Sequence, residues 1–387
     1  MIGFEYYNPA KIVFGEGSET HIKGLLKEHL VTSLLLVYSG DFIKDLGIYA
    51  AIEQAVSELG IRFSENGNVV PNPSIELVRE LVEQGKRNQV DFVLAVGGGS
   101  AIDTAKAVAI GIPYEGDPWD FFAKGISPKE VLPIGVIATT ASSGSETSNA
   151  AILSNGEWKL GFEDDRIIPK FAIMNPAYTV NLPSYQTFVG IADVLSHLLE
   201  RYFSDEKNSD TTDYLIEGAI RALFINADKL QKNEQDIQAR GEIQWLASVA
   251  HGGFLDAGRI ADWGSHRIEH ELSAQYNITH GEGMAIVMVA WIKYMAKEKP
   301  WRPALLASRI FGVDSYHYTQ EERAEILAER LDDFFRKIGL RTRLSELGID
   351  DRDFDSMAKR ATKNGTVGHY VALDGEKIKA ILELAIK

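Results

Sequence analysis

Five side chains in the second half of the chain have the types and spacing that could bind a transition metal. Asp193 and His197 are four residues apart, and so are His266 and His270, so each pair would share one face of a helix. His280 follows ten residues after His270. Carboxylate and imidazole donors together suit Fe(II) or Zn(II) better than Ca²⁺ or Mg²⁺. A catalytic metal takes about three or four protein ligands. One histidine is therefore expected to have another role, and the spacing does not say which.

The surroundings of Asp193 favour a bound cation. The predicted helix around it is largely apolar, and a carboxylate buried on such a helix is costly unless something pairs with it. A lone histidine is more often a packed or surface residue, so the hypothesis depends on the two paired spacings. The chain has no cysteine, which excludes disulfides, thiolate zinc sites and cysteine nucleophiles. Any metal must therefore be bound by histidines and carboxylates.

A glycine turn in the first half of the chain suits a nucleotide diphosphate. Gly97-Gly98-Gly99-Ser100 follows a predicted strand at 92–96 and precedes a predicted helix at 101–110. Glycines let the backbone approach a pyrophosphate, and a helix N-terminus offers N–H groups and positive potential. Ser100 could cap the helix or donate to a phosphate. The segment lacks the G-x-G-x-x-G pattern and the acid that usually follows it, and a tight turn that needs small residues is an equal alternative.

Two other segments could contact the same nucleotide. Residues 139–146 are mostly small or hydroxylated and follow a predicted strand at 132–138, so they could surround a ribose or a nicotinamide amide; an ordinary loop is the alternative. Asp41 follows the predicted strand 34–38, where a carboxylate would favour the free 2′-hydroxyl of NAD over the 2′-phosphate of NADP, or would be a simple loop acid. A metal site and a dinucleotide site in one chain suggest metal-assisted hydride transfer.

The order of predicted elements indicates two domains. Short apolar strands at 34–38, 92–96, 132–138 and 171–174 alternate with helices at 49–59, 74–88 and 101–110, which is typical of a parallel sheet covered on both faces. Strand character ends near Pro183, and helices are expected at 185–203, 210–226, 236–255, 266–276, 283–296, 303–311, 319–338 and 375–385. We therefore predict an α/β nucleotide-binding domain over 1–182 and an all-helical metal-binding domain over 183–387, with the reaction in the cleft between them.

Composition restricts the partners of this chain. Its 387 residues favour two domains, and its formal net charge of −15 argues against broad nucleic-acid binding. The first residues do not resemble a signal peptide, and the longest apolar stretch, 283–294, is too short to span a bilayer. We expect a cytoplasmic protein that binds neither nucleic acid nor membrane.

These motifs together resemble the iron-dependent (group III) alcohol dehydrogenase family, and most closely its butanol dehydrogenase branch. The resemblance runs nearly end to end and is found in residues 4–15, 71–73, 97–106, 139–146, 193–197, 266–270 and 280–281. It implies a Rossmann-like α/β domain followed by an all-α metal domain, the fold shared with dehydroquinate synthase. It also implies a small alcohol or aldehyde substrate, Fe²⁺ or Zn²⁺, NADP or NAD, and often a homodimer.

The resemblance assigns roles to individual positions. It implies that the metal is bound by Asp193, His197, His266 and His280. His270 matches a histidine near the substrate that could relay a proton. The matching cofactor positions are Gly98, Gly99, Ser100, Thr139 and Thr140, with less specific matches at Asn72, Asp103, Ser143 and Lys159. Asp103 and Lys106 could instead form a local pair.

One departure leaves the choice of cofactor open. NADP-preferring relatives tend to have a Gly-Gly-Gly-Ser stretch where this chain has Ser39-Gly40-Asp41-Phe42, and the NAD-specific propanediol branch has an Asp at the position of Gly40. Asp41 adds a negative charge one position later.

The predicted reaction is reversible oxidation of a primary alcohol such as butanol by NAD(P)⁺, with the metal as Lewis acid. The alternatives are a dehydroquinate-synthase-like lyase, a glycerol-dehydrogenase-like enzyme and a non-catalytic binding protein. A lyase with an anionic substrate would need cations near the metal. Arg201, Arg259 and Arg267 do not decide this point, but the His266–His270 spacing favours the dehydrogenase.

Overall fold

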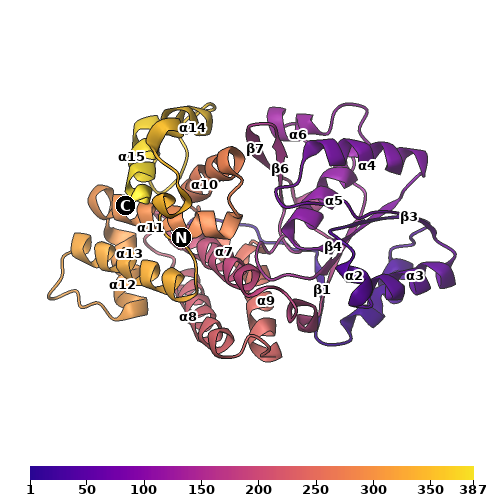
Figure 1. Ribbon diagram of the computed structural model, residues 1–387, viewed down its shortest axis with the longest axis horizontal. Coiled ribbons are helices and arrows are strands. Elements are labelled where there is room, and N and C mark those ends of the chain that lie inside the picture. Colours follow the sequence, from indigo (N-terminus) through magenta and orange to yellow (C-terminus); the bar gives the residue numbers. More distant parts are fainter. The chain divides into compact units, whose positions relative to one another are not determined.

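The computed structural model describes residues 1–387, and they form two compact units (Figure 1). The strand unit comprises Tyr7–Leu182 and Gln235–Gly252, and the helical unit comprises Met1–Tyr6, Pro183–Glu234 and Gly253–Lys387. One helix from the second half of the sequence, α9 (Ile237–His251), therefore folds with the strands. The sequence predicted a single domain boundary after residue 182, and this boundary stays a prediction. The two compact units differ from it in two places: residues 1–6 belong to the helical unit, and α9 belongs to the strand unit.

The strand unit is built on a parallel sheet of six strands in the order β1-β8-β5-β4-β2-β3. Its strands are β1 (Lys11–Phe14), β2 (Ser33–Tyr38), β3 (Arg62–Asn66), β4 (Phe92–Gly97), β5 (Ile134–Ala138) and β8 (Phe171–Met174). The predicted parallel sheet is thus confirmed. The two strands of this sheet that the sequence analysis missed, β1 and β3, lie at the sheet edges and are only partly buried. An edge strand lacks the continuous apolar run that marks the buried strands.

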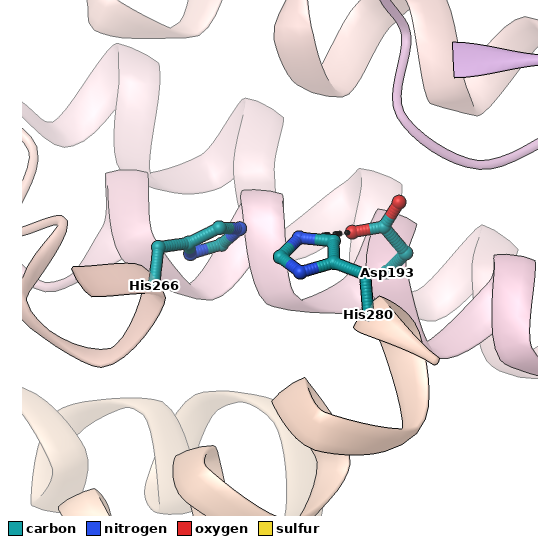
Figure 2. A group of neighbouring side chains, drawn as sticks. All are labelled: Asp193, His266 and His280. Atoms are coloured by element: carbon teal, nitrogen blue, oxygen red, sulfur yellow. Dashed lines mark ion pairs between the residues drawn. The ribbon is translucent and has the colours of Figure 1, made fainter. Parts of the chain in front are cut away.

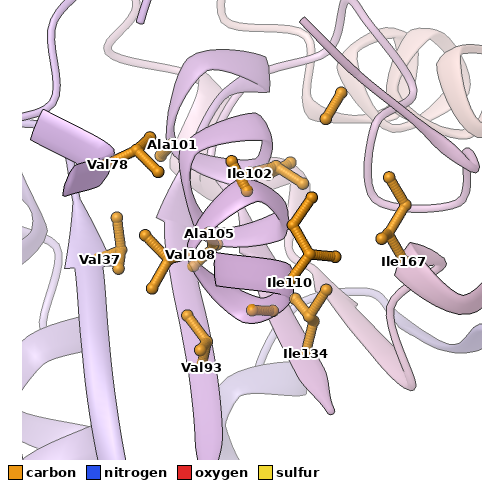
Figure 3. Close-up of a cluster of buried hydrophobic side chains, with 14 of the residues drawn as sticks. Val37, Val78, Val93, Ala101, Ile102, Ala105, Val108, Ile110, Ile134 and Ile167 are labelled. Carbon is orange, nitrogen blue, oxygen red and sulfur yellow. The ribbon is translucent and has the colours of Figure 1, made fainter. Parts of the chain in front are cut away.

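Helices cover both faces of this sheet. The helices of the strand unit are α1 (Ile22–Glu28), α2 (Phe42–Asp45), α3 (Ile48–Leu59), α4 (Ile75–Arg87), α5 (Gly99–Gly111), α6 (Trp119–Lys124) and α9, with short 3₁₀ turns η1 (Ser18–His21), η2 (Asp165–Ile167) and η3 (Pro176–Thr179). Side chains of β2 alternate between two cores: Leu35 and Val37 pack with α4 and α5, while Leu34 and Leu36 pack with α1 and α3. Figure 3 shows the first of these cores, with α5 lying across the strands that carry Val37 and Val93. This packing holds the start of α5 against the ends of the central strands.

The start of α5 differs in one respect from the prediction. The helix begins at Gly99, and its N-cap is Gly98, which has no side chain to accept a hydrogen bond. Ser100 is therefore inside the first turn, and the expectation that it could cap the helix is wrong, because the chain turns into the helix two residues earlier. Helix α4, in contrast, has a side-chain cap: the Ser74 hydroxyl accepts from the Leu77 N–H.

A hairpin that the sequence analysis missed lies beside α5. Strands β6 (Ala150–Asn155) and β7 (Trp158–Glu163) pair antiparallel, and Gly156 adopts a φ of 58° in the turn between them. The paired strands place Lys159, a predicted cofactor residue, on β7, where it is 7% exposed.

The helical unit contains no regular strand, in agreement with the prediction. Its helices are α7 (Ser184–Tyr202), α8 (Asp210–Lys232), α10 (Gly264–Tyr276), α11 (His280–Glu298), α12 (Trp301–Phe311), α13 (Gln320–Lys337), α14 (Phe354–Ala361) and α15 (Gly375–Ile386), with 3₁₀ turns η4 (Phe254–Asp256), η5 (Leu344–Leu347) and η6 (Asp351–Asp353). Helix α11 begins at His280, three residues before the predicted start. None of the helices is long and apolar enough to cross a membrane.

Candidate active site

Three of the predicted metal ligands converge in the helical unit. Asp193 lies in the middle of α7, His266 in the first turn of α10, and His280 is the first residue of α11. Figure 2 shows the three side chains directed toward one another. One donor atom from each lies within 4.8 Å of the other two, and Nε2 of His280 is 3.5 Å from Oδ1 of Asp193. Asp193, His266 and His280, all singled out as candidate ligands in the sequence, thus lie close together in the fold.

The chemistry of this group fits a divalent transition metal. Asp193 and His266 are 4% and 6% exposed, so a carboxylate and an imidazole are enclosed side by side. Nε2 of His266 is buried and has no hydrogen-bond partner in the chain, which is unfavourable for an imidazole nitrogen unless a ligand occupies that position. One carboxylate and imidazole nitrogens suit Fe²⁺ or Zn²⁺.

The other two histidines border this group. Nδ1 of His197 is 3.8 Å from Oδ1 of Asp193, and its ring stacks on His266 with centroids 4.9 Å apart. The ring of His270 lies 5.8 Å from that of His280, and its donor atom forms a second close group with those of Glu269 and His280. All five residues singled out by spacing therefore lie at one site, and the division of roles between His197 and His270 stays a prediction.

Two buried glutamates at the site were not predicted. Glu200 receives hydrogen bonds from Nδ1 of His266 at 2.9 Å, from the Ser265 hydroxyl at 2.5 Å, and from the backbone N–H groups of His266 and Trp263 at 3.0 and 2.8 Å. Burial alone would raise the pKa of the Glu200 carboxyl, but these donors outweigh it and lower that pKa. Its position could have been inferred, since residue 200 lies one helical repeat after Asp193 on the same face.

The second glutamate, Glu269, had no such spacing signal. It is fully buried in α10 and accepts hydrogen bonds from Nδ1 of His280 and from the Ser273 hydroxyl. Glu269 and His280 belong to different helices, so their contact depends on how α10 turns into α11 at Asn277, whose φ is 52°.

Two arginines named in the sequence analysis are bound to acids of the chain. Arg201 donates to Asp256 at 3.1 Å and lies over the Trp263 ring, and Arg259 donates to Asp213 at 2.5 Å. These guanidinium groups therefore neutralise acids of the protein, which weakens the argument for an anionic substrate at the metal group.

The two predicted nucleotide-binding segments, residues 97–100 and 139–146, are in contact in the strand unit. They follow β4 and β5, which are neighbours in the sheet, and the Thr139 N–H donates to the Gly97 carbonyl at 3.0 Å. A Cβ added at Gly98 would lie 2.6 Å from the Thr140 hydroxyl, and one added at Gly99 would lie 2.6 Å from the Ser143 hydroxyl. The absence of a Cβ at Gly98 and Gly99 thus permits this close approach within the chain, as the alternative of a tight turn of small residues expects, and nucleotide binding by these glycines stays a prediction.

The hydroxyl of Thr139 is directed into this region without a bonding partner. Thr139 is 1% exposed, and its Oγ1 is buried and makes no hydrogen bond within the chain. A buried hydroxyl is normally hydrogen-bonded, so a ligand group that donates or accepts at this position fits the arrangement.

Asp41 and Asn72 lie on neighbouring segments of the same unit. Asp41 follows β2, its side chain is 81% exposed, and Oδ1 is 2.7 Å from the ammonium of Lys44. Asn72 lies between β3 and α4 with a φ of 54°. Both segments follow the carboxyl ends of parallel strands, where ligands of such sheets commonly bind.

The buried Lys106 forms hydrogen bonds both to the 139–146 segment and to the first residue of the β6–β7 hairpin. The Lys106 ammonium, on α5, donates to Ser145 Oγ at 2.9 Å, to the Ser148 carbonyl at 2.8 Å and to the Ala150 carbonyl at 2.7 Å. Asp103, one turn earlier, accepts from the Ser145 hydroxyl at 2.7 Å. Burial lowers the pKa of Lys106 to about 8 and raises the pKa of Asp103, while their mutual attraction opposes both changes. The Ser145 hydroxyl thus bridges Lys106 and Asp103, and both the direct pair and a cofactor contact of Asp103 stay predictions.

Helix α9 supports the second nucleotide segment from the other side. The Ser248 hydroxyl donates to Glu146 at 2.5 Å, and Nδ1 of His251 is 2.6 Å from the Ser143 carbonyl oxygen. Gly144, with a φ of 64°, packs so closely that an added Cβ would lie 2.3 Å from the Ala247 carbonyl oxygen. Sequence reasoning missed this support because α9 was assigned to the helical domain.

Comparison with known proteins agrees with this geometry. Residues 9–176 match the family described as iron-containing alcohol dehydrogenase, and residues 187–386 match the C-terminal domain of the same family. A probable NADH-dependent butanol dehydrogenase of Bacillus subtilis is 35% identical over 388 residues, the full length of both chains. An NADPH-dependent aldehyde reductase of Escherichia coli is 29% identical over 97% of each chain. The crystal structure of an NADH-dependent butanol dehydrogenase from Thermotoga maritima superposes with a TM-score of 0.95 at 34% identity, covering 100% of this chain and 99% of that one.

These matches span both halves of the sequence and both predicted sites. They confirm the resemblance and the fold class expected from the motifs, and they favour the dehydrogenase over the lyase and the non-catalytic alternatives. The chain belongs to the iron-containing alcohol dehydrogenase family.

Proposed function

We propose that this chain, a metal- and NAD(P)-dependent alcohol dehydrogenase and aldehyde reductase, acts on a primary alcohol about the size of butanol and on its aldehyde. The convergence of Asp193, His266 and His280 is the observation that carries the proposal. The butanol dehydrogenases among the relatives support the substrate class. When bound, Fe²⁺ or Zn²⁺ supplies the Lewis acid that polarises the substrate oxygen, and NAD(P) supplies or accepts the hydride.

The residues divide into two sets in this proposal. The helical domain, 183–387, would bind the metal through Asp193, His197, His266 and His280, with His270 positioned to exchange the substrate proton. The α/β domain, 1–182, would bind the cofactor through Asp41, Asn72, Gly98, Gly99, Ser100, Asp103, Thr139, Thr140, Ser143 and Lys159. We further propose that the protein works in the cytoplasm as a homodimer.

The proposal is tested by assaying butyraldehyde reduction with the Fe²⁺-loaded and the Zn²⁺-loaded protein, with NADH and NADPH in parallel. Turnover is expected only with metal present, and chelation followed by dialysis should abolish it. Absence of turnover with both cofactors, across a panel of short aldehydes and both metals, would refute the proposed function.

Asp41→Ser should shift cofactor preference toward NADPH. Removing one negative charge near the expected adenosine ribose should raise kcat/KM for NADPH relative to NADH by about fivefold, the effect of a unit charge about 4 Å from a phosphate in water. Lys44, released from its ion pair with Asp41, would become available to the 2′-phosphate. Asp45→Ser, at the other end of the short helix α2 that Asp41 precedes, is the control and should leave the ratio unchanged. An unchanged ratio in Asp41→Ser would place the ribose elsewhere.

His270→Ala should slow turnover and change its pH dependence. A positioned proton-transfer group contributes about 10²-fold or more, so kcat is expected to fall by about that factor at pH 7. The loss should diminish at high pH, where hydroxide can take the alcohol proton directly. The exposed His317→Ala is the control. If kcat of His270→Ala equals that of the wild type from pH 6 to 10, the relay role is wrong.

A further inference from the structure

We propose that Glu200 and Glu269 are positioning residues, each of which orients one metal-binding histidine through the ring nitrogen that faces away from the metal. This inference rests on the proposed metal site. Oε1 of Glu200 is 2.9 Å from Nδ1 of His266, and Glu269 is hydrogen-bonded to Nδ1 of His280. In both rings the other nitrogen, Nε2, lies on the side of the ligand group: that of His280 is 3.5 Å from Asp193 Oδ1, and that of His266 is buried without a hydrogen bond.

The chemistry of the imidazole explains why a carboxylate at Nδ1 matters. A neutral histidine has one N–H, and an ionised carboxylate can only accept a hydrogen bond. A carboxylate at Nδ1 therefore keeps the proton there and leaves the lone pair of Nε2 for the metal. It also fixes the ring orientation and makes the nitrogen more basic, and loss of such a partner typically weakens metal binding by about 10–100-fold.

Both carboxylates are themselves held in place. Glu200 is 1% exposed and, besides His266, receives the Ser265 hydroxyl and the Trp263 N–H at the start of α10. Glu269 is fully buried and receives the Ser273 hydroxyl. A Cβ at Gly283 would lie 2.7 Å from a Glu269 carboxylate oxygen, so the glycine lets α11 approach this group closely.

The two contacts link the three ligand helices in sequence. Helix α7 carries the ligand Asp193 and, two turns later, Glu200, which binds the His266 ring of α10. Helix α10 in turn carries Glu269, which binds the His280 ring of α11. Each helix thus orients the histidine of the next one.

The test measures metal affinity and coordination directly. Glu200→Gln and Glu269→Gln keep the side-chain shape and remove the charge, and each should weaken Zn²⁺ binding by about 10-fold or more in competition with a chromophoric chelator. The d–d spectrum of the Co²⁺-loaded variants should shift relative to wild type, which a change in stability alone would not cause. Glu217→Gln is the control, because Glu217 is equally buried but binds Tyr202 and Arg309.

A second variant guards against misfolding. Ser273→Ala removes one hydrogen bond from Glu269 without changing charge, and should weaken Zn²⁺ binding by up to about fivefold. Unchanged affinity and an unchanged Co²⁺ spectrum in folded Glu200→Gln and Glu269→Gln would overturn the inference while leaving the metal site intact. A wild-type protein that binds no Zn²⁺ or Co²⁺ would overturn the proposed metal site and this inference together.

Discussion

Asp193→Ala is expected to lose bound metal and to lower kcat/KM for aldehyde reduction by about 10³-fold or more. Asp193 is the one carboxylate in the close group with His266 and His280, and only it supplies negative charge to a divalent ion there. Lewis-acid activation contributes several kcal/mol to such reactions, and each 1.36 kcal/mol corresponds to about tenfold in rate. Steady-state kinetics together with metal analysis of the purified variant measure both effects.

Two comparisons make this result specific. Asp193→Asn keeps an oxygen donor without its charge and should retain intermediate metal affinity. Asp256→Ala removes a carboxylate of the same unit that binds Arg201 and should leave metal content and turnover close to wild type. Full metal content and activity in Asp193→Ala would show that the metal, if any, is bound elsewhere.

Lys106→Met is expected to lower the free energy of unfolding by about 3 kcal/mol at pH 7. Lys106 is fully buried and interacts electrostatically with the partly buried Asp103, and removing one of two such charges leaves the other uncompensated. The substitution also removes the donor shared by Ser145, Ser148 and Ala150. Chemical denaturation at pH 7 measures the loss.

The same variant has a characteristic pH dependence. Burial lowers the pKa of Lys106 from 10.5 to about 8, so the folded protein releases this proton at lower pH than the unfolded chain does. Between pH 8 and about 10.5 the unfolded chain binds more protons, and wild-type stability therefore rises with pH relative to Lys106→Met, by up to about 3 kcal/mol. The exposed Lys23→Met, which breaks a pair with Glu58, should cost less than about 1 kcal/mol and show no such trend. Parallel pH curves for wild type and Lys106→Met would contradict the expected titration.

Local spacing in the sequence was sufficient to single out two pairs of candidate metal ligands. Asp193 and His197, like His266 and His270, are four residues apart, so a helix alone brings each pair onto one face. The apolar surroundings of Asp193 predicted a buried acid, and the structure has it 4% exposed. The glycine turn was equally local, since a strand, a turn and a helix follow one another directly in the chain.

Contacts between segments that are distant in the sequence could not be predicted from local spacing. The Glu269–His280 hydrogen bond depends on the angle between two helices, and no periodicity encodes that angle. The edge strands β1 and β3 are partly exposed and mix polar with apolar residues, so their alternation is weak. The cap expected at Ser100 failed because the sequence does not show at which glycine the turn becomes helix.

The place of α9 has a consequence for how the protein is made. A ribosome that has synthesised the first 182 residues has delivered every strand of the sheet but not the helix against which residues 143–148 pack. Another 70 residues, from 183 to 252, must emerge first, which takes several seconds at about 5–20 residues per second. During that interval Glu146 lacks its partner Ser248, and α7 and α8 are synthesised before α9. The nascent chain would therefore begin to form its helical unit before α9 completes the strand unit, and a fragment that stops at residue 182 should be prone to aggregation.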